Sequence, residues 1–368
     1  MHQQIVHPPL LPSTEIQKLI TSITGITYKI IRWNTKFFGS TISSLFELLP
    51  SIVNKIKESD KKEVILSILN GVIGDYLEEK NNPLQLEMEF RSQSKSVQLN
   101  TKSLKENFPN NSGKIILMIH GSCMSSLQWT RNNHNHGEIL ANDLNKTLLY
   151  LNYNSGRHIS TNGKNLNKLL KTLSKNWPVP IKEITIIAHS MGGLVTRSTL
   201  YYAKKQNQNW VKSLKKVVFL GTPHHGSPIE KIGNYLDLVL ATVPYAKPFA
   251  KLGKIRSAGV TDLRYGNIID KDWKNKNRFE LRSDDRQTIQ LPKEIEFYAI
   301  AGVLSNKLNN LLGDGDSLVD LKSALGKHKN PDKDLIFLKE NTLILYENNH
   351  LDLLSNPQIT DKLKVWLS

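Results

Sequence analysis

A serine, an acidic loop and a histidine follow one another along this chain in an order that suits covalent catalysis. Ser190 lies in the segment 188–192 (AHSMG), at the end of an apolar run. A serine between very small residues, at a sharp turn from strand to helix, is typical of a nucleophile elbow. Ala188 stands where glycine is usual, but alanine is the next smallest residue. The first turn of the following helix favours an oxyanion, so the segment predicts a nucleophile at Ser190.

The acid and the base that such a serine needs lie downstream. Asp316 belongs to the loop segment 313–319 (GDGDSLV), and His350 lies close to the end of the chain. The order serine, acid, histidine is that of α/β-hydrolases. We expect His350 to take the proton from Ser190, and Asp316 to fix the tautomer of that imidazole. Asp314, in the same loop, is the alternative acid.

An oxyanion hole requires backbone N–H donors, and two turns can supply them. The apolar run 115–119 ends at His120-Gly-Ser122, where the glycine lets the backbone approach closely. The N–H groups of Ser122 and Met191 are therefore the predicted donors. Three neighbouring residues are expected to contact the substrate: His120, Gly121 and His189.

The remaining candidates for chemistry receive non-catalytic interpretations. Cys123 is the only cysteine, which excludes an internal disulfide, and no dedicated base is visible for it. It is interpreted as a small buried side chain. His134 and His136 have no further His or Cys pair at ligand spacing, so they are interpreted as a solvated loop. The sequence therefore predicts neither a metal nor another cofactor.

Six short apolar runs, separated by helical stretches, must position these residues. They cover residues 115–119, 147–151, 184–188, 217–220, 295–300 and 342–346. Such an alternation is typical of a parallel sheet with helices on both faces, and residues 86–99 suggest a hairpin before it. The expected fold class is α/β, an α/β-hydrolase fold with a mostly parallel central sheet. We expect this domain over residues 84–368, with residues 226–290 inserted as a lid or cap.

Residues 1–83 are expected to form a helical N-terminal extension. Apolar residues recur at helical spacing from Ile16 to Ile31, from Ile42 to Ile56 and from Val64 to Tyr76. The favoured interpretation is that this apolar face packs against the following domain or a second subunit. The alternative is peripheral contact with a membrane, because lysines lie beside the apolar face.

Charge and composition limit the partners. The 368 residues carry a formal net charge of +16, which would suit an anionic partner. The lysines are scattered, however, without a block of about five or six like charges, so we expect a solvated basic surface and no nucleic acid. The sequence contains neither a signal-peptide pattern nor an uncharged apolar stretch of roughly 18 residues. A cytoplasmic location is expected, with membrane association as the alternative.

Four segments together resemble bacterial lipase-like α/β-hydrolases, including predicted hydrolases related to the GPI inositol-deacylase group. They are HSMGG at 189–193, LGTPHHGS at 220–227, GDSLV at 315–319 and NHL at 349–351. The resemblance spans about residues 84–368 and implies a carboxylic ester, including a lipid ester, as the substrate. It also implies that the insertion from about Gly226 to Gly266 is a lid over an apolar acyl site.

The resulting hypothesis is hydrolysis of a carboxylic ester through an acyl intermediate on Ser190. Thioesterases, amidases and acyltransferases remain alternatives, because the same groups act on the carbonyl whatever the leaving group is. A protein with an idle hydrolase fold that binds a membrane surface or a partner is the alternative of another class. The simultaneous occupation of all the catalytic positions argues against it.

Overall fold

The computed structural model describes Pro50, Val53 and residues 59–92, 94–228, 256–278, 283–307 and 314–368. Two sets of predictions lie outside this part of the chain. The first is the helical structure expected before residue 50. The second is the part of the predicted lid over residues 229–255, which includes the apolar residues expected to line the acyl site, Leu236, Leu238, Val239, Leu240, Val243, Pro244 and Tyr245.

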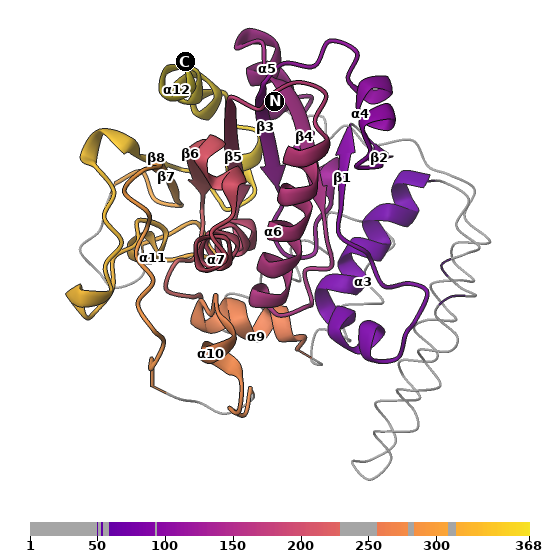
Figure 1. The fold of residues 1–368 in the computed structure, drawn as a ribbon. Helices are drawn as coiled ribbons and strands as arrows, with labels where there is room; N and C mark the ends of the chain where they lie inside the picture. Colours follow the sequence, from indigo (N-terminus) through magenta and orange to yellow (C-terminus); the bar gives the residue numbers. More distant parts are fainter. Residues whose placement is uncertain are drawn as a thin grey trace, which may run out of the picture.

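Within the described residues, one eight-stranded sheet forms the centre of the molecule (Figure 1). Its strands are β1 (Glu89–Ser92), β2 (Lys95–Val97), β3 (Lys114–Ile119), β4 (Thr147–Asn152), β5 (Glu183–His189), β6 (Leu214–Leu220), β7 (Glu296–Val303) and β8 (Thr342–Tyr346). Their spatial order is β2-β1-β4-β3-β5-β6-β7-β8, and β3 to β8 run parallel. β1 pairs antiparallel with β2 and β4, which confirms the predicted hairpin. This sheet confirms the predicted α/β-hydrolase fold class.

The central strands are buried on both faces, which explains their composition. Residues 115–119 of β3 are at most 1% exposed. A strand covered on both sides needs apolar residues at every position, so its apolar residues run continuously instead of alternating. Each of the six predicted runs falls on one of β3 to β8. Because these strands are parallel, the loops that follow them leave from one edge of the sheet, and this edge carries His120, Ser190 and His350.

Helices cover both faces of this sheet. They are α3 (Ser59–Glu79), α4 (Thr101–Asn107), α5 (His136–Asp143), α6 (Ile159–Asn176), α7 (Met191–Lys205), α9 (Ala258–Tyr265), α10 (Asp270–Trp273), α11 (Leu321–Ala324) and α12 (Pro357–Leu367). α6 and α7 pack against each other in front of the sheet (Figure 1). The step from β3 to β4 crosses the sheet in the opposite direction to the step from β4 to β5. Right-handed connections therefore place α5 on the other face, where it packs against α12.

The third predicted amphipathic run, Val64–Tyr76, lies inside α3. Its apolar side chains are buried or partly buried, and Ile68, Leu69 and Ile73 are at most 1% exposed. α3 packs against α9, which comes late in the chain. Among the described helices, none combines the length and the apolar character that a membrane span would need.

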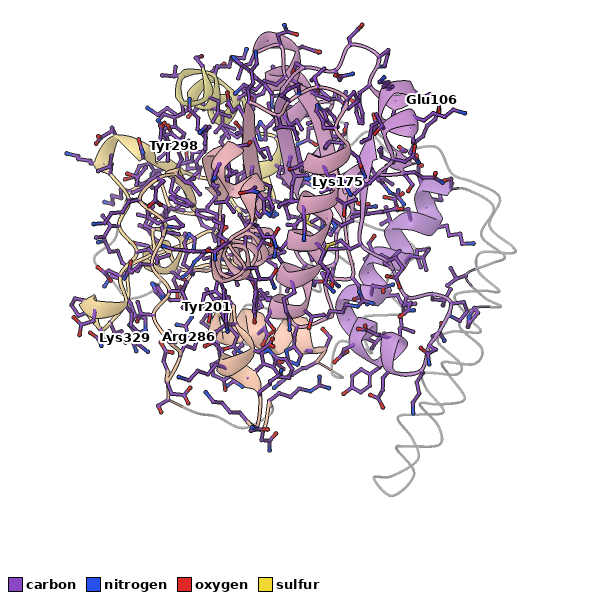
Figure 2. The ribbon with its side chains drawn as sticks, in the orientation of Figure 1. Glu106, Lys175, Tyr201, Arg286, Tyr298 and Lys329 are labelled. Atoms are coloured by element: carbon purple, nitrogen blue, oxygen red, sulfur yellow. The ribbon has the colours of Figure 1, made fainter. Side chains whose placement is uncertain are left out.

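Charged side chains on the outer helices and loops are exposed (Figure 2). They include Glu106 on α4, Lys175 on α6 and Lys329 in the loop after α11. Exposure is ordinary for charged side chains, which are rarely buried without a partner.

Candidate active site

Ser190 is the single residue between β5 and α7. Its backbone has φ 53° and ψ −123°, a conformation that residues other than glycine rarely adopt. The N–H of Ser190 donates to the carbonyl of Leu220 at 2.8 Å, which ties the turn to the end of β6. The turn is crowded, because a Cβ on Gly192 would lie 2.5 Å from the carbonyl oxygen of Ile119. This is the strained strand–turn–helix geometry of a nucleophile elbow.

An aspartate and a histidine pair at the same edge of the sheet. The Nδ1–H of His350 donates to Oδ2 of Asp316 at 2.7 Å, and neither side chain has exposed surface. The other carboxylate oxygen accepts the N–H groups of Leu318 and Val319, at 3.1 and 2.8 Å. These bonds fix the carboxylate and assign the proton of the neutral imidazole to Nδ1, so Nε2 is the basic nitrogen. Of the two candidate acids, Asp316 and not Asp314 makes this bond.

The backbone of Ser190 contacts Leu220 at the end of β6, and the side chains of His350 and Asp316 lie against the next residue, Gly221. The ring of His189, the residue before the serine, lies 4.6 Å from the ring of His350 between centroids. Its Nε2–H donates to the carbonyl of His350 at 3.1 Å. A Cβ on Gly221 would lie 3.0 Å from Cε1 of His350 and 3.1 Å from Oδ2 of Asp316. The Ser190 hydroxyl is buried nearby and makes no hydrogen bond within the described residues.

The predicted oxyanion turn packs directly on the serine. A Cβ on Gly121 would lie 3.0 Å from Cβ of Ser190 and 3.0 Å from Nδ1 of His189. A larger residue there would displace one of these groups, so the close approach requires glycine. Ser122 and Met191, whose N–H groups are the predicted donors, adjoin this contact in the sequence and are buried.

Cys123 continues the same turn. Its side chain is fully buried, as predicted, and its backbone φ is 60°. Its N–H donates to Oγ of Ser155, in the loop after β4, at 3.0 Å. Burial raises the pKa of the Cys123 thiol to about 12, so the sulfur is protonated at neutral pH and is a poor nucleophile. The residue therefore shapes the turn without reacting.

Burial keeps two imidazoles near Ser190 neutral. It lowers the pKa of His120 to about 4 and the pKa of His189 well below its ordinary value. The His120 ring stacks on Tyr153 with 4.4 Å between centroids, and the Tyr153 hydroxyl donates to the His120 carbonyl at 2.9 Å. Nε2 of His120 and Nδ1 of His189 have no hydrogen-bond partner among the described residues. Buried polar atoms of this kind are normally satisfied by a water or a ligand.

The interpretation of His134 and His136 as a solvated loop is wrong. His136 begins α5 with no exposed surface, and its ring lies 4.8 Å from that of His134. Both imidazoles hydrogen-bond Oγ1 of Thr360 on α12, at 2.8 and 2.7 Å. They join α5 to α12, and this contact excludes water from His136. In the part of the chain that the structure describes, no group of three His, Cys, Asp or Glu side chains is placed to hold a metal ion.

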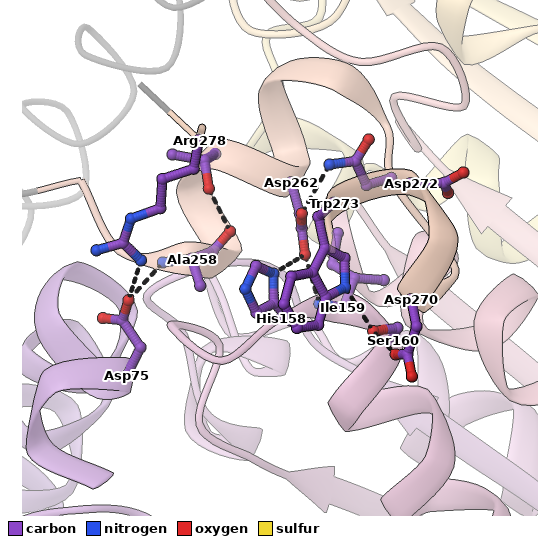
Figure 3. A network of polar contacts seen from close by, with 12 residues as sticks. Asp75, His158, Ile159, Ser160, Ala258, Asp262, Asp270, Asp272, Trp273 and Arg278 are labelled. Atoms are coloured by element: carbon purple, nitrogen blue, oxygen red, sulfur yellow. Dashed lines mark hydrogen bonds and ion pairs between the residues drawn. The ribbon is translucent and has the colours of Figure 1, made fainter. Parts of the chain in front are cut away.

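A cavity of about 210 Å³, between α9, α10 and the start of α6, is lined by none of these catalytic candidates. The network of polar contacts in this region is shown in Figure 3. The Asp262 carboxylate accepts the Nδ1–H of His158 and the N–H of Ile159, both at 2.9 Å, and so caps α6. The His158 ring stacks on Trp273 with 3.5 Å between centroids. Nε1–H of Trp273 donates to Oγ of Ser160 at 2.9 Å. This network anchors α9 and α10 on α6.

Sequence reasoning did not find the part that α3 plays at the catalytic edge. The carbonyl of Gly71 accepts the Oγ–H of Ser257 at 2.7 Å, and the carbonyl of Gly74 accepts the Nδ2–H of Asn154 at 2.9 Å. A Cβ on Gly71 would collide with Cys123 of the oxyanion turn. The available signal was a pair of glycines three residues apart in an apolar helix, which indicates a close approach of another backbone.

Comparison with known proteins identifies a family for the central part of the chain. The family model of the PGAP1-like alpha/beta domain matches residues 110–293, half of the 368-residue chain. Among curated proteins, none matches the sequence significantly.

Solved structures that are similar to this chain include three from different organisms. The mature lipase BlEst2 of Bacillus licheniformis is 18% identical over 69% of this chain and 92% of its own, with a TM-score of 0.45. The esterase Pf2001 of Pyrococcus furiosus is 16% identical over 70% of this chain and 83% of its own, with a TM-score of 0.38. Lipase B of Aspergillus fumigatus is 11% identical over 94% of this chain and 83% of its own, with a TM-score of 0.42.

Proposed function

Because this chain belongs to the family of PGAP1-like alpha/beta domains, we propose that it is a serine hydrolase that cleaves carboxylic esters through Ser190. One observation carries the proposal. The buried Asp316–His350 pair, at 2.7 Å, lies at the sheet edge where Ser190 stands in a strained turn. Nucleophile, base and orienting acid are the three roles that acyl transfer requires.

In the first half of the reaction, Nε2 of His350 takes the proton from Oγ of Ser190 as this oxygen attacks the ester carbonyl carbon. Asp316 stabilises the resulting imidazolium through its bond to Nδ1. The carbonyl oxygen becomes an oxyanion, which the N–H groups of Ser122 and Met191 stabilise. His350 then gives its proton to the leaving alcohol, and the acyl group remains on Ser190.

In the second half, water attacks the acyl carbon while His350 takes one of its protons. The same proton returns to Oγ of Ser190 as the carboxylic acid leaves. His189 contacts the base throughout, and burial holds its pKa well below the ordinary value. An uncharged neighbour does not oppose the positive charge that forms on His350 in each half reaction.

An ester is proposed as the substrate on the resemblance of the segment 220–227 to lipases. A thioester or an amide would engage the same groups, so the substrate class is tested directly. A series of p-nitrophenyl esters of increasing chain length should be hydrolysed faster than a matched acyl thioester or anilide. If the thioester or the anilide is cleaved faster, that class of compound is the substrate and the ester is not.

A covalent probe tests the nucleophile. A fluorophosphonate should label Ser190 in the folded full chain and stop ester hydrolysis. Ser190→Ala should lose the label and about 10⁶-fold in kcat, with a thermal midpoint changed by only a few degrees.

Ser174→Ala provides a matched control, because this serine lies near the end of α6 that is remote from the catalytic edge. It should keep both the label and the turnover. A wild type that takes no label, or turnover by Ser190→Ala at the wild-type rate, would contradict the proposal.

A further inference from the structure

We infer that helix α3 positions the oxyanion turn, through the contact of Gly71 with Cys123, and this role rests on the proposed function. A Cβ on Gly71 would overlap Sγ of Cys123 and would lie 2.8 Å from its Cα and 2.9 Å from its N. Two of these three atoms belong to the backbone, so a larger residue at 71 must move the turn itself. Cys123 directly follows Ser122, whose N–H is a predicted oxyanion donor.

Besides this contact, the turn packs on Ser190 and is held by the loop after β4. Cys123 has a φ of 60°, which is unfavourable for a residue with a side chain. Its N–H is held by Oγ of Ser155 at 3.0 Å. The adjacent Asn154 donates from Nδ2 to the carbonyl of Gly74 at 2.9 Å, so the loop that supports the turn also rests on α3. α3 therefore contacts both the turn and the loop that supports it.

Ion pairs hold α3 to the rest of the fold at each of its ends. Near the start, the Glu63 carboxylate pairs with Arg91 of β1 and accepts the Nδ2–H of Asn152 at 3.0 Å. Near the end, the Glu78 carboxylate accepts the Nε–H of Arg157 at 2.7 Å. α3 is kinked at Ile73, between Gly71 and Gly74, and these ion pairs hold the helical segments on both sides of the kink.

The chemical consequence concerns one step of the reaction. An oxyanion donor acts only when it lies at hydrogen-bond distance from the developing charge, and a shift of about 1 Å costs roughly 10²-fold in rate. The bond between His350 and Asp316 involves neither α3 nor the turn. Displacing the turn should therefore lower kcat and leave the pH profile of kcat unchanged.

The test compares Gly71 of α3, which contacts the turn after β3, with Gly113, which lies just before β3. Gly71→Ala adds a methyl group against the turn that follows the strand. Gly113→Ala adds the same group before the strand, where its Cβ would lie 2.6 Å from the carbonyl oxygen of Pro180. In each variant, fluorophosphonate labelling taken to completion counts the competent sites, and kcat is expressed per labelled site. A merely structural defect lowers the number of sites but does not change this ratio.

For Gly71→Ala we expect kcat per site to fall about 10- to 100-fold, with KM and the pH profile near those of the wild type. Gly113→Ala should keep the wild-type kcat per site even if it is less stable. An unchanged kcat per site in Gly71→Ala would overturn the inference alone, and so would an equal fall in Gly113→Ala. A wild type with neither label nor turnover would overturn the proposed function together with it.

Ser155→Ala covers the case in which Gly71→Ala does not fold. It removes the acceptor of the Cys123 N–H without adding a clash. We expect kcat per site to fall about 3- to 10-fold, because the turn loses the hydrogen bond that holds the Cys123 N–H. A wild-type kcat per site in this variant would overturn the inference.

Discussion

The pairs Asp316–His350 and Asp262–His158 have nearly the same geometry in different surroundings. Nδ1 of the histidine lies 2.7 Å from the carboxylate in the first pair and 2.9 Å in the second. Both aspartates are at most 1% exposed. The distance and the burial of the aspartate therefore do not distinguish a pair that could relay a proton from a pair that holds the fold together.

The neighbours of each imidazole make the distinction. His350 is fully buried at the sheet edge that carries the strained Ser190. The side chain of His158 is 19% exposed and stacks on Trp273, while its carboxylate partner also caps α6. An aspartate–histidine pair becomes a candidate catalytic group only when a nucleophile stands beside the imidazole.

The largest effect is expected from an asparagine substitution in the pair beside Ser190. Asp316→Asn should lower kcat by about 10⁴-fold, because an amide no longer favours the tautomer with its proton on Nδ1. Asp314→Asn, in the same loop, is the matched control and should retain nearly full activity. Steady-state hydrolysis of a p-nitrophenyl ester measures both, and a larger loss in the control would transfer the acid role to Asp314.

Buried neutral histidines form a third kind of site, and they are tested by the stability of the protein in acid. Burial lowers the pKa of both His120 and His136 to about 4, whereas in the unfolded chain each titrates near 6.5. The unfolded state therefore binds protons first, and stability is lost as the pH falls from about 6.5 to 4, by up to about 3 kcal/mol for each group. Urea unfolding at pH 7 and pH 4.5 should show this loss.

His136→Gln checks the assignment, because glutamine cannot titrate in this range. The variant should lose less of its free energy of unfolding than the wild type over the same pH interval, whatever its stability at pH 7. An identical pH dependence in the two proteins would mean that His136 is not the group responsible.

The smallest effect is expected at the second pair. Asp262→Asn replaces one acceptor oxygen of a buried carboxylate that receives hydrogen bonds from His158, Ile159 and Asn267. The free energy of unfolding should fall by about 1–3 kcal/mol, while kcat stays within about twofold of the wild type. Urea unfolding and the ester assay measure the two quantities, and a tenfold loss of kcat would make the pair part of the active site.

Features that depend on residues close to one another in the sequence could be predicted. β3 and β5 were evident because burial on both faces demands continuous apolar runs, and the turn at Ser190 because crowding selects small residues around it. Contacts between distant segments could not be predicted. His136 is buried by Thr360, 224 positions later, and no local pattern records that neighbour.

The dihedral angles of Ser190 carry a cost that the rest of the fold must offset. A residue with a side chain in this region of φ and ψ lowers the free energy of unfolding by about 1–3 kcal/mol. Glycine at this position would avoid most of that cost. A laboratory evolution experiment that rewards heat resistance alone would therefore drive position 190 towards glycine. The hydroxyl persists only where turnover is rewarded too, so thermostable variants of this chain must be screened for both properties at once.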